Sequence, residues 1–134
     1  MNIFLAAPLF NVAEREFNYK IANELRENGF EVWLAQESTN IIFNHKVEKR
    51  RIYDDCISAL KSSDIVVAVL DGSDVDSGVA YEVGYAKVLG KPIVGLKTDL
   101  RTFSLVDEVN LMLDVSMDKI CKNMNEVRDF LKNM

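Results

Sequence analysis

Strand-length apolar runs alternate with helix-length segments along most of this chain. The run from Asp64 to Leu70, DIVVAVL, is almost continuously apolar, as expected of a central parallel strand that is covered on both faces. Segments with apolar residues at helical spacing come before and after it. Strands that alternate with helices in this way predict an open α/β sandwich with a parallel sheet.

The predicted elements extend from the first residues to the last. Gly29 stands where a helix C-cap is expected, between the first helix and the second strand. The polar stretch Gln36–Asn44 is long enough to be a functional loop. The expected strands are Ile3–Ala7, Phe30–Leu34, Asp64–Leu70, Pro92–Leu96 and, at the sheet edge, Val115–Ile120. The expected helices are Ala13–Asn28, Lys46–Ser62, Val79–Leu89, Leu105–Leu113 and Glu126–Lys132.

Length and charge narrow the class of protein. The 134 residues predict one domain, 1–134, at roughly 100 to 200 residues per domain. The 21 acidic and 16 basic residues give a net charge of -5, so no basic field is expected to hold a nucleic acid polymer. No apolar run approaches the ~20 residues of a membrane span, so we expect no membrane contact.

Several common chemistries lack their motifs. Cys56 and Cys121 form no CxxC pair and cannot build a zinc site with the single His45, so we expect thiols in a reducing cytoplasm. His45 lies in a polar stretch without a GxSxG nucleophile pattern and is expected to face solvent. Neither GxGxxG nor GxxxxGK[ST] occurs, so bound NAD or ATP is not expected.

Four carboxylates fall within twelve residues, at the junction between the third expected strand and the helix that follows it: Asp71, Asp74, Asp76 and Glu82. Such junctions are where parallel sheets bind ligands. We expect Asp71 and Ser77 to be turn formers or helix caps.

Glu82 differs from these residues because small residues surround it in GVAYEVGYA, which lets the helix lie close to the sheet. The helix dipole is expected to favour its ionised form, which a nucleophile requires. Gly78 is expected to let a ligand approach the backbone closely. The alternative is a packed, salt-bridged Glu82.

The stretch LDGSDVDSGVAYEVGYAKVLGKPIVGL, from Leu70 to Leu96, resembles the signature of the nucleoside 2-deoxyribosyltransferase family. The opening NIFLAAPLFN, the AQ that ends at Gln36 and the NLM that begins at Asn110 are similar as well. The resemblance implies a flavodoxin-like three-layer α/β sandwich with a mostly parallel five-stranded sheet. It also implies transfer of a 2-deoxyribosyl group between nucleobases, with no cofactor and no metal, a reaction of nucleotide salvage.

The resemblance also assigns roles to residues. It implies that Glu82 is the nucleophile and forms a covalent deoxyribosyl ester, with the logic of a retaining glycosidase. Asp76 matches the acid that binds the sugar 5'-hydroxyl. Asn110 matches a residue that reaches into the neighbouring subunit's site, which implies a homo-oligomer, either a dimer or a hexamer. Gln36 is similar to a residue that reads the edge of the base, and Phe10 to an apolar wall beside it.

Two positions depart from the family pattern. Phe4 stands where many members carry Tyr, and the missing hydroxyl is expected to relax discrimination against ribose or to favour hydrolysis. The family acid that protonates the leaving base lies eight residues before the acid that opens the third strand, which is Cys56 here. Its neighbour Asp55 is the candidate for this role if the helix is shifted or bulged.

Three functions therefore stay open. The first is nucleobase exchange on 2'-deoxynucleosides, with nucleosides and nucleobases as partners. The second is a nucleoside or nucleotide N-glycosidase of the same fold, in which water attacks the ester. The third is a non-catalytic nucleotide-sensing module.

Overall fold

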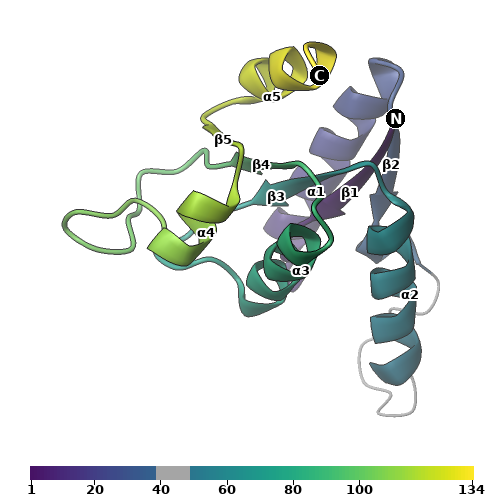
Figure 1. Cartoon of the computed structure of the whole chain (residues 1–134), viewed down its shortest axis with the longest axis horizontal. Coiled ribbons are helices and arrows are strands. Elements are labelled where there is room, and N and C mark those ends of the chain that lie inside the picture. The colour runs from purple at the N-terminus through teal and green to yellow at the C-terminus, as the bar shows by residue number, and fades with distance from the viewer. Residues whose placement is uncertain (39–48) are drawn as a thin grey trace.

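The computed structural model describes residues 1–38 and 49–134, and in these residues strands and helices alternate (Figure 1). The strands are β1 (Asn2–Ala6), β2 (Glu31–Leu34), β3 (Ile65–Val69), β4 (Ile93–Leu96) and β5 (Lys119–Cys121). The helices are α1 (Val12–Glu27), the 3-10 turn η1 (Ala35–Glu37), α2 (Lys49–Ser62), α3 (Ser77–Val88), α4 (Leu111–Ser116) and α5 (Met124–Lys132).

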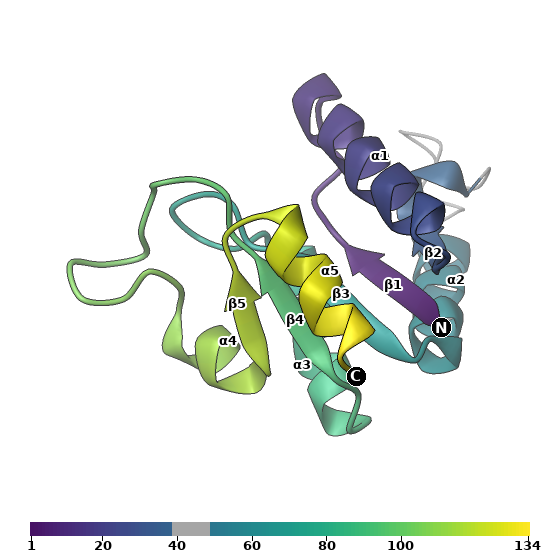
Figure 2. The same ribbon diagram turned by 90° about the horizontal axis from the view of Figure 1, so that it is seen from above.

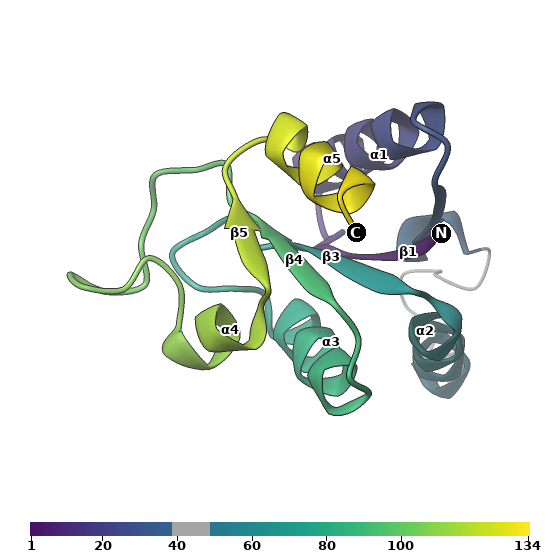
Figure 3. The same cartoon turned by 45° about the horizontal axis from the view of Figure 1, so that its top comes forward.

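The strands form one sheet in the order β2-β1-β3-β4-β5, and every pair of neighbours is parallel. Helices α1 and α5 cover one face, and α2, α3 and α4 cover the other (Figure 3). This three-layer arrangement confirms the predicted α/β sandwich. The sheet is parallel throughout, whereas the prediction was a mostly parallel one.

Each face of the sheet has its own apolar core, and the alternation of side chains along the strands supplies both. In β1, Ile3 and Leu5 belong to one core, whereas Phe4 and Ala6 belong to the other. All five residues of β3 are buried, which confirms the prediction from the apolar run DIVVAVL.

The structure corrects the elements predicted after Lys97. The helix expected over Leu105–Leu113 is absent there, and α4 begins only at Leu111 because the Asn110 side chain caps it by accepting from the Met112 amide at 2.9 Å. The edge strand expected over Val115–Ile120 begins at Lys119, since Val115 lies in α4. The first residues of the helix predicted over Lys46–Ser62, the polar stretch from residue 39 on, and His45 lie outside the described residues.

The strand order places a crevice at the carboxyl ends of the central strands. From β1 the chain passes through α1 to β2 on one side, whereas the rest of the sheet is built on the other side of β1. The loops that leave the carboxyl ends of β1 and β3 therefore diverge, and in such sheets ligands bind at this point. None of the helices in residues 1–38 and 49–134 has the length and apolar character of a membrane span.

Candidate active site

A cleft of about 430 Å³ opens at the carboxyl ends of β1 and β3. One wall comes from Pro8 and from residues at the start of α1, including Asn18. The other wall is the loop after β3, with Asp71, Gly72, Asp74 and Asp76, and Arg101 also borders the cleft. Three of the four carboxylates singled out in the sequence therefore lie at the crevice that the strand order predicts.

Asp76 begins α3 and borders the cleft. Its Oδ2 atom accepts hydrogen bonds from the amides of Gly78 at 3.0 Å and Val79 at 3.1 Å, so it is the N-cap of the helix. Its Oδ1 atom has no hydrogen-bond partner within the described parts of the chain. A Cβ on residue 78 would lie 3.1 Å from Asp76 Oδ2, so glycine at this position leaves room for the cap.

Glu82 lies on the face of α3 that packs toward the sheet. Val79, Val83 and Ala86, which are spaced as one helical face with Glu82, are buried. The Glu82 carboxyl has no hydrogen bond or ion pair to any residue of ranges 1–38 and 49–134. Burial, followed by the charge of Asp76, raises its pKa from 4.5 to about 8. The carboxyl is therefore largely neutral at pH 7, rather than ionised as was expected at this place on the helix, because burial and the charge of Asp76 favour the protonated form.

Cys56 on α2 lies within electrostatic range of Glu82. Burial, followed by the charges of Glu82 and Asp55, raises the pKa of the Cys56 thiol from 9.0 to about 11. The thiol is thus protonated at neutral pH and is a poor acid. Asp55 borders a separate cavity of about 760 Å³ between β2 and α2, together with Trp33 and Ser58. Cys56, the position that the family spacing indicates, therefore lies within electrostatic range of Glu82, and the role of Asp55 in protonating the leaving base stays a prediction.

Gln36 and Asn18 join the loops beside the cleft. Gln36 Nε2 donates to the Arg15 carbonyl at 2.9 Å, and its Oε1 accepts from Asn18 Nδ2 at 2.9 Å. Asn18 Nδ2 also donates to the Pro8 carbonyl at 2.8 Å. Each end of the Gln36 amide keeps the capacity for one more hydrogen bond. Asn18 was missed in the sequence because its place on α1 resembles that of any polar helix residue.

The two phenylalanines to which the sequence analysis assigned site roles differ in their exposure to solvent. Phe10 is 67% exposed at the entry to α1. Phe4 is fully buried and stacks on Trp33, with ring centroids 5.0 Å apart. Phe4 therefore has no surface that a ligand reaches in this structure, and its expected influence on the sugar stays a prediction.

Asn110 is the N-cap of α4, which packs against α3. In the layer of α2, α3 and α4, Asn110 is therefore on the side of α3 that is away from α2. Its Oδ1 atom caps α4. Its role in a neighbouring subunit's site stays a prediction.

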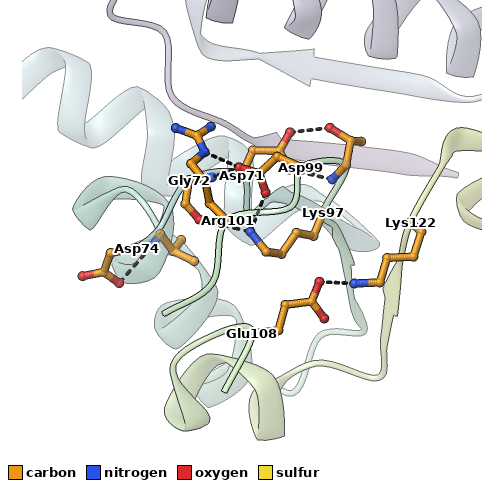
Figure 4. A network of polar contacts seen from close by, with 10 residues as sticks. Asp71, Gly72, Asp74, Lys97, Asp99, Arg101, Glu108 and Lys122 are labelled. Atoms are coloured by element: carbon orange, nitrogen blue, oxygen red, sulfur yellow. Dashed lines mark hydrogen bonds and ion pairs between the residues drawn. The ribbon is translucent and has the colours of Figure 1, made fainter. Parts of the chain in front are cut away.

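A network of hydrogen bonds and ion pairs joins the loops after β3 and β4 beside the cleft (Figure 4). This network was not predicted from the sequence. Asp71 is a loop-forming residue, as expected, but its partners come from the loop after β4: its Oδ1 and Oδ2 atoms accept from the amide and the hydroxyl of Thr98, both at 2.6 Å. Lys97 and Asp99 complete the network. Nothing in the sequence around Lys97 shows that this lysine is buried.

Comparisons with known proteins agree with this architecture. The sequence profile of the family described as nucleoside 2-deoxyribosyltransferase matches residues 3–130. The fold is similar to that of a 2-deoxyribosyltransferase from Bacillus psychrosaccharolyticus, with 25% identity, 96% of this chain and 91% of that chain covered, and a TM-score of 0.82. A search of curated proteins finds no match.

Two more distant structures share the fold. A 2-deoxyribosyltransferase from Leishmania mexicana is 21% identical, with 96% of this chain and 95% of that chain covered and a TM-score of 0.75. A CMP N-glycosidase from Clostridium botulinum is also 21% identical, with 98% and 99% covered and a TM-score of 0.55.

The raised pKa of Glu82 predicts a distinct pH dependence of stability. The unfolded chain releases this proton near pH 4.5, whereas the folded protein keeps it up to about pH 8. The free energy of unfolding of the wild type should therefore fall relative to that of Glu82→Gln between these two values, and the difference should stay constant above them. Urea unfolding of both proteins from pH 5 to 9 measures it, with Glu27→Gln at the exposed end of α1 as control. Parallel curves for wild type and Glu82→Gln would contradict the buried, protonated carboxyl.

Proposed function

Because the chain belongs to the nucleoside 2-deoxyribosyltransferase family, we propose that it exchanges nucleobases on 2'-deoxynucleosides through a covalent deoxyribosyl–Glu82 intermediate. The observation that carries the proposal is the placement of Glu82. Its carboxyl is largely buried and unpaired within the described residues, on the helix whose first turn borders the cleft at the β1–β3 crevice.

The proposed reaction has two displacements at the anomeric carbon. In the first, a carboxylate oxygen of Glu82 forms a bond to C1' while the bond from C1' to the base nitrogen breaks, and the departing base takes up a proton. In the second, a nitrogen of the incoming base bonds to C1', the ester bond breaks, and this base loses a proton. Each step inverts the anomeric carbon, so the configuration is retained overall.

Burial of Glu82 has two consequences for this chemistry. At neutral pH the carboxyl is largely protonated in the empty site, so it must lose its proton before it attacks. Once ionised, it carries a negative charge that is shielded from water, beside the positive charge that develops on the sugar ring. A charge interaction of this kind is stronger in a water-excluded site than in solvent.

We assign the substrate contacts to Asp76, which borders the cleft, and to Gln36 and Phe10, which are not among its lining residues. Asp76 keeps Oδ1 available to accept the sugar 5'-hydroxyl, while Oδ2 caps α3. Gln36, held by Asn18 and Arg15, presents the remaining capacity of its amide to the edge of the base. Phe10 supplies an exposed apolar wall.

The proposed chemistry uses a carboxylate and two bases, so it requires neither a cofactor nor a metal. The leaving base takes its proton from water, or from Asp55 if a shift of α2 brings this carboxyl from its separate cavity to the cleft, because Cys56 is too weak an acid.

We further propose that the protein is a homo-oligomer in which Asn110 completes a neighbouring site. The segment between β4 and α4 projects from the body of the molecule (Figures 1 and 2). It carries exposed Leu105 and Val106, and the adjoining α4 carries exposed Met112 and Val115. Large apolar side chains gathered in this way are typical of surfaces that meet another protein.

The free cysteines Cys56 and Cys121 support a cytoplasmic location, where salvage of nucleosides would occur.

The direct test of the activity is incubation of the protein with thymidine and adenine, followed by chromatography of deoxyadenosine, thymine and free deoxyribose. We expect deoxyadenosine to form, and Glu82→Gln to reduce its rate at least about 1000-fold, since the nucleophile is lost. Glu27→Gln should match the wild type. Thymine without deoxyadenosine would instead identify a hydrolase, and no product from a panel of nucleosides would favour the binding module.

Mixing inactive variants tests the shared site. Asn110→Ala and Glu82→Gln should each be nearly inactive alone, because each lacks one half of the site. Hybrid oligomers of the two should recover about a quarter of wild-type activity under random pairing of subunits. Asn123→Ala, which removes the equivalent cap of α5, is the matched control and should stay active. An inactive mixture, or a fully active Asn110→Ala protein, would contradict the shared site.

A further inference from the structure

Lys97 is a buried cation that the proposed chemistry does not use. It follows β4 directly, and its side chain is 1% exposed. Its Nζ atom pairs with Asp99 Oδ1 at 2.6 Å and donates to the carbonyl of Gly72 at 3.0 Å (Figure 4). Removing an ammonium group from water is costly, so a buried lysine needs partners with good geometry. One of these partners lies 25 residues away, in the loop that carries Asp76.

Asp99 binds the same glycine from its other side. Its Oδ2 atom accepts from the Gly72 amide at 2.7 Å and from Arg101 Nε at 2.6 Å. Burial raises the pKa of Asp99, but hydrogen bonds from Lys97, Gly72 and Arg101 outweigh it, so the net pKa is lowered and the carboxylate is ionised at neutral pH. Both backbone groups of Gly72 are thus held by one ion pair. We call Lys97, Asp99 and Gly72 the loop clamp.

Gly72 adopts a conformation that suits this contact. Its φ angle is +114°, where residues with side chains are strained, and a Cβ would lie 3.1 Å from the Asp74 carbonyl oxygen. The Asp71 carboxylate also accepts hydrogen bonds from the amide and hydroxyl of Thr98 and from the Asp99 amide. The loops after β3 and β4 are therefore joined directly where the two strands end.

Gly72, the residue that the loop clamp holds, lies four residues before Asp76. Val75, directly before Asp76, is buried in the apolar core that α3 also contacts. The segment from Gly72 to Val75 is therefore fixed at its first residue by the loop clamp and at its last residue by the core. Asp76 then caps α3 and borders the cleft, and Gly72 and Arg101 border the same cleft. A shift of Gly72 would therefore be transmitted to Asp76.

We propose that Lys97 and Asp99 are positioning residues, which hold the loop after β3 so that Asp76 faces the sugar of the substrate. The role of Asp76 in binding rests on the proposed function, whereas the hold on the loop does not. Uncharged residues would suffice to fill the space beneath the loop, but only paired donors and acceptors satisfy both the amide and the carbonyl of Gly72.

Hydrogen exchange tests the structural half of the proposal without any substrate. In Lys97→Met the amides of Gly72, Gly78 and Val79 should exchange at least about tenfold faster than in the wild type, because the clamp and the Asp76 cap loosen together. Lys122→Met, which removes an exposed lysine that pairs with Glu108, is the matched control and should leave these amides unchanged. If Lys97→Met does not fold, Asp99→Asn takes its place. Unchanged exchange in a folded clamp variant would overturn the proposal.

A double-mutant cycle with Asp76→Asn tests the functional half. Lys97→Met should raise the KM for thymidine about tenfold with kcat within about twofold, and should have less than about a twofold effect once Asp76 is replaced. Equal effects in both backgrounds would show that the clamp acts through something other than Asp76 and would overturn the proposal. Absence of base exchange in the wild type and in Lys122→Met would refute the proposed function instead, and hydrogen exchange would still decide whether the clamp holds the loop.

Discussion

The parallel pairing of β1 with β3 is the contact on which the rest of the structure depends. Ile3 to Ala6 of β1 lie opposite Ile65 to Ala68 of β3, and all eight residues are buried. Because the chain continues from these two strands toward opposite edges of the sheet, their loops diverge and leave the cleft between them. The same pairing brings the start of α1 and the start of α3 to one place, so Asn18 and Asp76 border one cleft.

The site is built at a cost in stability. Glu82 occupies a position on α3 whose neighbours on the same helical face are apolar, and burial of its carboxyl favours the neutral form. Lys97 is a second buried ionisable group, but its ammonium group has two partners, the Asp99 carboxylate and the Gly72 carbonyl. The two buried groups therefore differ in whether the folded protein supplies partners for them. Pairing makes Lys97 a structural cation, whereas Glu82 has no hydrogen-bond or ion-pair partner in residues 1–38 and 49–134, which fits the nucleophile role that we propose for it.

The sequence predicts those elements whose signal is local. The unbroken apolar run of β3 and the spacing of apolar residues in α1 and α3 predict both the layers and the crevice. The helix expected over Leu105–Leu113 is wrong because Leu105 and Val106 are apolar but exposed, so periodicity there does not report a core. The neutral state of Glu82 depends on the burial of its carboxyl in the folded protein, and the burial of Lys97 depends on a contact with the distant Gly72. No local pattern carries that information. The charge of Glu82 raises the pKa of the Cys56 thiol, so the position that the family spacing indicates for the leaving-base acid lies within electrostatic range of Glu82.

The central claim is that Glu82 becomes covalently bonded to the sugar, and mass spectrometry of the quenched protein tests it most directly. The protein is mixed with thymidine in the absence of an acceptor base, denatured in acid within the first turnover, digested and analysed. The account predicts the added mass of one deoxyribosyl group on the peptide that carries Glu82, and its removal when adenine is supplied before the quench. An unmodified Glu82 peptide in a protein that exchanges bases at its normal rate would contradict the account, because the second base would then displace the first directly.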